Sequence, residues 1–242
     1  MNLAIDFGNT LVKVAVFQMG DMVHFEAHPD FTLKKLRLLL KKFRISRAIV
    51  SSVVNDSAPI EKLLQKSYHF VKLNPATALP ISNQYETPGS LGMDRLAGMC
   101  GASFMMPGKN VLVINAGTCI TYDVITAEAV YFGGNITPGL EMRLKALNTF
   151  TDRLPLVRKQ FSYELFGKST VASILTGVIR GSYLEMNGFI TEYKKNYRGL
   201  KVILTGGDAP IFETMTKSKI FAVPNLVLYG LNKILTLNEP NQ

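Results

Sequence analysis

A strand–turn–strand pattern occurs twice in this chain of 242 residues, and the copies lie about half its length apart. Residues 5–10 read Ile-Asp-Phe-Gly-Asn-Thr, and residues 114–119 read Ile-Asn-Ala-Gly-Thr-Cys. In each copy an apolar run ends near a polar residue, a glycine follows, and another apolar run begins. Two ordinary hairpins that resemble each other by chance are the alternative. A true repeat predicts two similar α/β domains, residues 1–109 and 110–242, with a cleft between them.

Apolar periodicity predicts strands and helices in alternation along both halves. In the first half we expect strands at 2–6, 11–17, 22–25, 48–54 and 69–73, and helices at 32–43 and 58–67. In the second cycle we expect helices at 93–106, 138–148, 170–196 and 224–236, and strands at 111–114, 120–125, 128–132 and 201–204. Such alternation is typical of sheets that are covered by helices.

The composition is that of a folded globular protein, with 47% hydrophobic and 19% charged residues. No apolar run approaches the roughly 18–20 residues that span a bilayer, so no membrane partner is expected. The N-terminus has no basic region and meets an acid at Asp6, which is unlike a secretion signal. The two cysteines, Cys100 and Cys119, lack metal-type spacing and fit the reducing cytoplasm.

The net charge of +9 favours anionic partners but does not choose among nucleic acid, a membrane surface and small phosphorylated ligands. Much of the positive charge lies in residues 34–44. There Leu33, Leu36, Leu40 and Phe43 follow a helical period, and basic residues occupy the opposite face. A solvated outer helix face is the plainer interpretation, since no aromatic–basic RNA-binding motif accompanies it. Nucleic acid is therefore not an expected partner.

The two glycine-bearing turns have the chemistry of a phosphate site. Backbone N–H groups and hydroxyls converge on phosphate in tight turns, where glycine leaves the approach open. Asp6 offers the carboxylate oxygen that Mg²⁺ prefers, while Thr10, Lys13 and Thr118 offer hydroxyl donors and a positive charge. Neither the Walker A pattern nor the protein-kinase motif set is present. Two plain hairpins, with Asp6 as a turn cap, are the alternative.

Residues 92–95, Gly-Met-Asp-Arg, place an acid beside a base at the expected start of a helix. Asp94 is suited to accept the proton of a hydroxyl group that attacks a phosphoryl group. Arg95 is suited to bind a substrate carboxylate through its two parallel N–H groups. The alternative is that Asp94 only favours the helix dipole and that Arg95 is a surface base.

Taken together, five segments in order resemble the type III pantothenate kinases, which belong to the actin-like, ribonuclease-H-fold ATPase superfamily. The resemblance covers nearly the whole chain. Its segments are Asp6-Phe7-Gly8-Asn9-Thr10 with Lys13, then Gly92-Met93-Asp94-Arg95 preceded by Tyr85, then 116–123, 133–139 and 205–209. One such segment occurs readily by chance, whereas five in order are specific.

The resemblance implies duplicated ribonuclease-H-like domains with mixed β-sheets flanked by helices. It implies transfer of the γ-phosphoryl group of ATP to the primary hydroxyl of pantothenate, the first step of coenzyme A biosynthesis, with Mg²⁺ held by Asp6. The implied ATP-binding residues are Asp6, Phe7, Gly8, Asn9, Thr10, Leu11, Val12, Lys13 and Thr118. Asp94 is the implied general base, and the implied pantothenate-binding residues are Tyr85, Gly92, Met93, Asp94, Arg95 and Thr170.

Two further features follow from the resemblance. Family members use a threonine of the neighbouring subunit, matched here by Thr170, so a homodimer is expected. The family usually has Asp where this chain has Asn115, and that Asp helps to bind an activating K⁺ or NH₄⁺ ion. Asn115 keeps an oxygen ligand but lacks the charge, so we expect the monovalent cation site to be weak, altered or lost.

Two other functions are compatible with this fold. Some relatives on this fold are described as transcriptional accessory factors, so a non-catalytic regulatory protein is one alternative. A kinase of another small hydroxy acid or sugar is the other. The presence of Asp6, Lys13, Asp94 and Arg95 favours a catalytic chain over a regulatory one.

Overall fold

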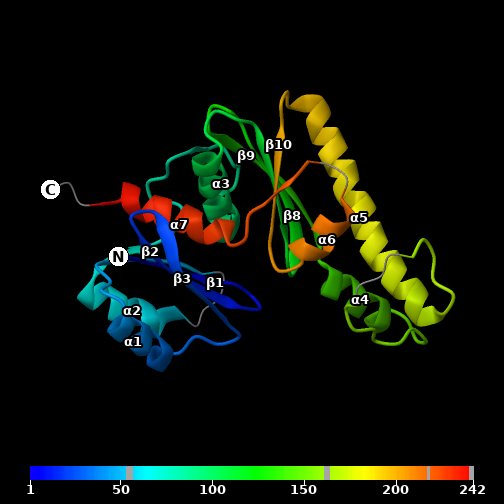
Figure 1. The fold of residues 1–242 in the computed structure, drawn as a ribbon, viewed down its shortest axis with the longest axis horizontal. Coiled ribbons are helices and arrows are strands. Elements are labelled where there is room, and N and C mark those ends of the chain that lie inside the picture. Colours follow the sequence, from blue (N-terminus) through cyan, green and yellow to red (C-terminus); the bar gives the residue numbers. More distant parts are fainter. Residues whose placement is uncertain (53–56, 161–163, 217–218, 240–242) are drawn as a thin grey trace. The chain divides into compact units, whose positions relative to one another are not determined.

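The computed structural model describes residues 1–52, 57–160, 164–216 and 219–239 (Figure 1). Contacts within the chain divide it into two compact units. The first unit comprises Met1–Gly108, Ile125–Gly133 and Asn225–Gln242, and the second comprises Lys109–Val124 and Gly134–Pro224. The predicted domain boundary between residues 109 and 110 stays a prediction.

A five-stranded mixed sheet forms the centre of the first unit. Its strands are β1 (Asn2–Phe7), β2 (Val12–Gln18), β3 (Asp21–His28), β4 (Arg47–Ser52) and β5 (His69–Lys72). The strand order is β3-β2-β1-β4-β5. The β1–β2 and β2–β3 pairs are antiparallel, whereas β1–β4 and β4–β5 are parallel. The expected strand 48–54 is therefore present as β4, and its last two residues lie outside the described ranges.

Helices α1 (Leu33–Lys42) and α2 (Ala58–Ser67) cover one face of this sheet. Their buried residues, Leu36, Leu39, Ile60 and Leu64, pack with apolar side chains of β1, β2 and β4. Burial of such side chains is the main stabilising contribution of a core. The basic residues of α1 alternate with this apolar stripe and are mostly exposed, as expected for a solvated helix face.

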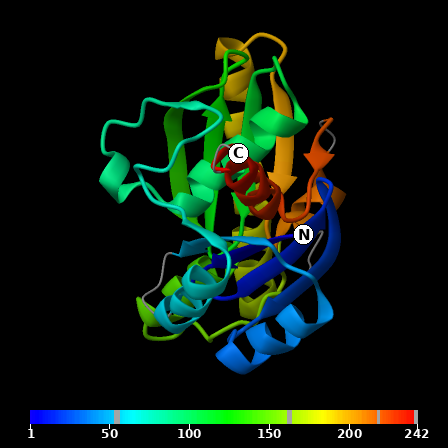
Figure 2. The ribbon, with the colours of Figure 1, turned by 90° about the vertical axis from the view of Figure 1, so that its left-hand side faces the viewer.

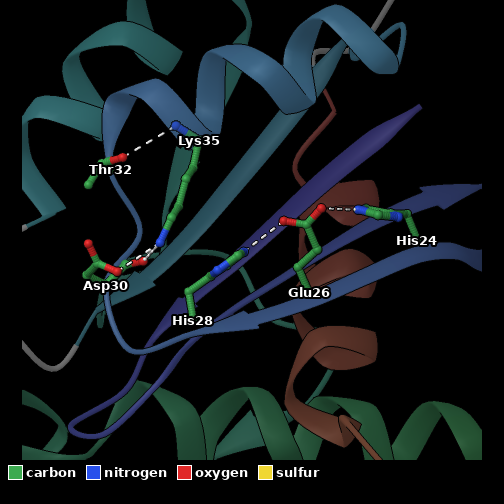
Figure 3. Close-up of polar contacts among 6 residues, drawn as sticks. All are labelled: His24, Glu26, His28, Asp30, Thr32 and Lys35. Atoms are coloured by element: carbon green, nitrogen blue, oxygen red, sulfur yellow. Dashed lines mark hydrogen bonds and ion pairs between the residues drawn. The ribbon is translucent and has the colours of Figure 1, made fainter.

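Polar contacts occur within the edge strand β3 and, separately, between the segment that follows it and α1 (Figure 3). Glu26 lies between two histidines of the same strand face, and its carboxylate oxygens are 2.6 Å from Nε2 of His24 and 2.8 Å from Nε2 of His28. Nζ of Lys35 donates to the Asp30 carboxylate at 2.8 Å, which ties α1 to the segment that precedes it. These contacts hold the pKa of Glu26 below its usual value, with the His28 hydrogen bond as the largest cause.

The opposite face of the first sheet is covered by α3 (Met93–Met105) and α7 (Leu226–Leu237). Figure 2 shows α7 on one side of the blue strands, with α1 and α2 on the other. A Cβ added to Gly230 of α7 would lie 1.8 Å from the carbonyl oxygen of Ala97, so the two helix backbones are in direct contact. The chain's last helix thus returns to the unit that contains its first strand.

The second sheet has six strands in the order β11-β10-β7-β8-β9-β6. Their bounds are β6 (Ser82–Asn83), β7 (Val111–Ala116), β8 (Cys119–Ile125), β9 (Val130–Pro138), β10 (Lys201–Thr205) and β11 (Phe221–Ala222). The helices of the second unit are α4 (Leu140–Thr149), α5 (Thr170–Asn196) and α6 (Ala209–Met215). Leu112, Ile114, Tyr122, Met186 and Ile190 contribute to its apolar core. The predicted mixed α/β architecture is confirmed.

Strand β9 differs from the sequence-based expectation, which ended it near residue 132. It continues through Gly133 and Gly134 because these glycines permit a close approach to neighbouring chain. A Cβ at Gly134 would lie 2.0 Å from the carbonyl oxygen of Tyr122. Helix α6 and the short strands β6 and β11 were not predicted, since none is long enough for a clear periodic pattern. Within the described residues no helix is both long and apolar enough to cross a membrane.

Candidate active site

Asp6 lies near the end of β1, the most buried strand of the first sheet, and its residue is only 7% exposed. Its Oδ1 atom has no hydrogen-bond partner among the described residues. Ser51 of β4 lies close enough to the carboxyl group to oppose the rise of its pKa. Burial raises the pKa of Asp6 to about 6, the negative charge of Asp94 adds to the rise, and Lys13 opposes it.

The turn between β1 and β2 places small and polar residues in front of Asp6. The Gly8 backbone N–H donates to the carbonyl oxygen of Leu11 at 3.2 Å, which closes the turn. Asn9 and Thr10, at its tip, are exposed. Lys13 pairs with Asp6 across the β1–β2 ladder and is half-buried. The turn therefore exposes donors next to a buried carboxylate.

The start of helix α3 positions the Asp94 side chain. Gly92 is its N-cap residue, and a Cβ added there would lie 2.6 Å from Oδ1 of Asp94. The absence of a side chain at position 92 is thus what leaves space for the Asp94 carboxylate. Asp94 is half-buried in the first turn of the helix, where the helix dipole favours a negative charge. Met93 is half-buried in the same turn.

Tyr85 and Arg95 lie together in the first unit. The guanidinium carbon of Arg95 is 5.6 Å from the centroid of the Tyr85 ring, the geometry of a cation–π contact. Arg95 is 7% exposed, so it is not an ordinary surface base. The Tyr85 ring stacks on Tyr131 of β9 with centroids 6.2 Å apart. A Cβ at Gly133, whose φ is +131°, would lie 3.1 Å from the Tyr85 ring.

Tyr131 and Gly133 were missed as supports of the predicted substrate residues. The sequence indicates that this region matters, because residues 133–139 resemble a segment of the family. The sequence does not show that this segment contacts Tyr85, because the two segments are distant in the chain.

The second turn, in the second unit, lies between β7 and β8 and exposes Thr118. Two other backbone segments lie directly against it. A Cβ at Gly139 would be 2.2 Å from the carbonyl oxygen of Gly117, and a Cβ at Gly206 would be 2.2 Å from that of Ala116. The Gly139 N–H also donates to the carbonyl oxygen of Thr118 at 3.1 Å. Glycine is required at both supporting positions by this close approach.

Asn115 is half-buried near the end of β7, opposite Thr205 of the parallel strand β10. Among the residues that the structure describes, no group of three or more His, Cys, Asp or Glu side chains is placed to hold a metal ion. Any ion at Asn115 or Asp6 would therefore need other oxygen ligands as well, such as side-chain hydroxyls and amides, backbone carbonyls, substrate or water.

Thr170 is the first residue of α5 and is exposed. Ser169, the N-cap, accepts a hydrogen bond from the Ala172 N–H at 3.2 Å. Thr170 lines a hollow of about 960 Å³ within the second unit, together with Arg143 and Lys168. The structure thus brings Asp6, Lys13 and Asp94 into one electrostatic cluster and joins Tyr85 to Arg95. Thr118, Asn115 and Thr170 belong to the other unit.

Known proteins resemble this chain over most of its length. The family model described as type III pantothenate kinase matches residues 2–192. The type III pantothenate kinases of Phocaeicola vulgatus and Christiangramia forsetii are each 46% identical to this chain, over 99% of both sequences. That of Porphyromonas gingivalis is 38% identical, over 98% of both.

The chain belongs to the type III pantothenate kinase family. The predicted family and the predicted class of enzyme, a kinase that uses ATP, are confirmed by these matches. Membership also implies that ATP is used together with a divalent metal ion.

Solved structures share the fold of this type III pantothenate kinase family member. A putative Baf family transcriptional activator from Campylobacter jejuni has a TM-score of 0.62 at 22% identity, with 98% of each chain covered. A putative N-acetylmannosamine kinase from Listeria monocytogenes has a TM-score of 0.53 at 13% identity, covering 98% of this chain and 99% of that one. At these identities the likeness shows the fold alone, and it agrees with the predicted mixed β-sheets flanked by helices.

Proposed function

We propose that this chain transfers the γ-phosphoryl group of ATP to the primary hydroxyl of pantothenate, the first step of coenzyme A biosynthesis, and that Asp94 is the general base. Family membership supports the reaction. The single observation that supports the base is the Asp6–Asp94 pair, because two carboxylates in one unit are close enough for one to raise the pKa of the other. Such a pair can divide the metal and proton roles between them.

Asp94 is the better candidate for the base on geometry. It lies on the first turn of a helix, half-exposed, with the side-chain-free Gly92 next to it. An alcohol needs a carboxylate within hydrogen-bond reach to accept its proton as the phosphoryl group is transferred. Asp6 is too deeply buried to reach a second substrate in the same way.

Asp6 is the proposed ligand of Mg²⁺. Its Oδ1 atom is buried and has no hydrogen-bond partner among the described residues, and its pKa is raised by burial although Lys13 opposes the rise. A carboxylate whose charge is only partly balanced in this way fits a hard cation. Bound Mg²⁺ would supply positive charge that neutralises the phosphates of ATP. The residues proposed to face those phosphates are Asp6, Phe7, Gly8, Asn9, Thr10, Leu11, Val12 and Lys13, with Thr118 contributed by the second turn.

Tyr85, Gly92, Met93 and Arg95 are proposed to bind pantothenate. The support is the Arg95–Tyr85 contact, which fixes a buried guanidinium group in the unit that carries Asp94. A guanidinium group binds a carboxylate by two parallel hydrogen bonds, and pantothenate carries one carboxylate.

We further propose a cytoplasmic homodimer in which Thr170 contacts the substrate bound to the neighbouring subunit. The hollow beside Thr170 is compatible with such a contact.

We propose that the monovalent cation site is weakened. The half-buried Asn115 offers an amide oxygen where the family usually has a carboxylate, so a K⁺ or NH₄⁺ ion would lose one full charge of attraction. A steep dependence of the rate on potassium would contradict this proposal.

Radiolabelled phosphate transfer is the test of the reaction. The chain is incubated with ATP that carries label on its γ-phosphate, with Mg²⁺ and with pantothenate or another hydroxy acid or sugar. We expect label on pantothenate and none on the other acceptors. Label on another acceptor alone would replace the substrate assignment, and no transfer combined with retention on DNA at physiological salt would favour a regulatory protein.

A further inference from the structure

Helix α5 carries one row of side chains that contacts strands β8 and β9 of the second unit. Glu185, Phe189 and Tyr193 are four residues apart and therefore share a face of the helix. The Phe189 ring stacks on Tyr122 with centroids 4.2 Å apart, and Tyr193 donates to Oδ1 of Asn135 at 2.8 Å. The row fixes α5 against the strands over more than two helical turns.

Glu185 is the most connected member of this row. Its Oε1 accepts hydrogen bonds from the Tyr122 hydroxyl at 3.0 Å and from the Thr137 hydroxyl at 2.8 Å. Its Oε2 accepts one from Nη2 of Arg143 at 2.7 Å. Three donors from three different elements thus meet on one carboxylate, and charge-assisted bonds of this kind are among the strongest in proteins.

The carboxylate is ionised in this setting. Burial by itself would raise the pKa of Glu185, but the hydrogen bonds from Arg143, Thr137 and Tyr122 hold it below its ordinary value. The pKa of the Tyr122 phenol is raised by burial and by the negative charge of Glu185, so the hydroxyl keeps its proton. The acceptor is therefore charged and the donors are protonated at neutral pH.

The contacts of Glu185 extend through neighbouring residues to the turn between β7 and β8. Arg143 also donates through Nε to the carbonyl oxygen of Pro138 at 2.7 Å. The next residue, Gly139, donates its N–H to Thr118 and has no room for a Cβ beside Gly117. Thr137 and Pro138 are thus both tied to the Glu185–Arg143 pair, and the residue after them lies directly against the turn.

We propose that Glu185 is a positioning residue for Thr118. The ionised carboxylate fixes the end of β9 through Thr137 and Arg143. Gly139, the next residue, contacts the turn that presents the Thr118 hydroxyl, so the position of the strand end determines the position of that turn. Glu185 touches no substrate. The inference rests on the proposed role of Thr118 at the ATP phosphates, and it adds a residue that no sequence motif includes.

The test compares Glu185→Gln with Glu192→Gln as a matched control. Glu192 lies on the same helix, and its carboxylate pairs with the exposed Lys195 on that helix. Glu185→Gln keeps the size of the side chain but loses its charge, so Thr118 shifts. We expect the KM for ATP to rise about tenfold, while the KM for pantothenate and the kcat change little. Glu192→Gln should leave all three unchanged.

Thr137 supplies a second pair of variants if Glu185→Gln does not fold. Thr137→Val removes the hydroxyl that donates to Glu185 and should raise the KM for ATP. Thr137→Ser restores the hydroxyl and should restore the KM. A purely structural role would lower the unfolding temperature without this split between the two KM values.

Thr118→Val separates failure of the inference from failure of the proposed site. If Thr118→Val raises the KM for ATP and folded Glu185→Gln does not, the positioning role of Glu185 is overturned. If Thr118→Val has no effect, the proposed role of Thr118 is wrong, and the role of Glu185 falls with it. A rise in both variants supports both.

Discussion

Asp6 is a buried carboxylate that is influenced by the negative charge of Asp94 and by the positive charge of Lys13. The effects of burial and of Asp94 outweigh that of Lys13, so the pKa of Asp6 rises to about 6. A carboxyl group whose folded pKa lies above its unfolded value of 3.8 binds its proton more tightly in the folded state. Its ionisation therefore destabilises the protein that lacks metal and ATP.

The first prediction concerns this pH dependence in Asp6→Asn. As pH rises from about 4 to 6, the unfolded state releases its proton first, so wild type should lose stability relative to Asp6→Asn, by roughly 3 kcal/mol at most. Urea unfolding of both proteins without metal or nucleotide measures the difference. Asp21→Asn, at an exposed position, should show no such trend. A gain of wild-type stability over Asp6→Asn across this window would contradict the account.

The second prediction concerns Gly92→Ala. The new methyl group would lie 2.6 Å from Oδ1 of Asp94, so the carboxylate must turn away from its present place. We expect kcat to fall about ten- to hundredfold, because a small misplacement of a reacting group is costly. Stability should change by about 1 kcal/mol or less, since the displaced atom ends a side chain.

Gly89→Ala is the matched control for Gly92→Ala, because a Cβ at Gly89 has no neighbour within 4 Å. It should leave kcat unchanged. If Gly92→Ala retains wild-type kcat while folded, the placement of Asp94 does not limit the reaction.

At the scale of elements, α3 is the helix that carries Asp94 and Arg95, and α7 packs directly against it. The two helices touch through glycines: a Cβ at Gly101 of α3 would lie 2.7 Å from the carbonyl oxygen of Leu226, and a Cβ at Gly230 of α7 would lie even closer to that of Ala97. Close backbone packing of this kind leaves little freedom for α3 to shift. The position of the proposed base therefore depends on the chain's last helix.

The third prediction tests this packing with Gly230→Ala. The added methyl group would lie 1.8 Å from backbone, which cannot move away as a side chain can. We expect the free energy of unfolding to fall by about 3 kcal/mol. Gly181→Ala, on the exposed part of α5 with no Cβ neighbour, should instead raise it by up to about 1 kcal/mol. Equal effects in urea unfolding would contradict the packing argument.

The regular elements were largely predictable because their apolar patterns are local. Helices α1, α2, α3, α5 and α7 occur where periodicity placed them, with shifts at their ends. Helix α6 was missed because seven residues are too few for a pattern. Strand β9 was predicted too short because glycine usually ends a strand, whereas here it permits contact between backbones.

At the scale of the whole molecule, the sequence predicted which segments form the site, but it did not predict which residues contact those segments in space. Asp6 and Asp94 were each recognised by motif, and their electrostatic proximity appears only in the structure. Glu185 could not be predicted, since a lone glutamate in a long helix reads as a solvated residue. Its importance comes from Tyr122, Thr137 and Arg143, which belong to other elements.

The most direct test of the central claim is the turnover of Asp94→Asn with ATP, Mg²⁺ and pantothenate, measured beside its affinity for ATP. The amide is nearly isosteric with the carboxylate but cannot accept the proton of the alcohol. We predict that phosphopantothenate formation falls about a hundredfold or more while ATP binding is retained. Turnover close to that of wild type would show that Asp94 is not the base.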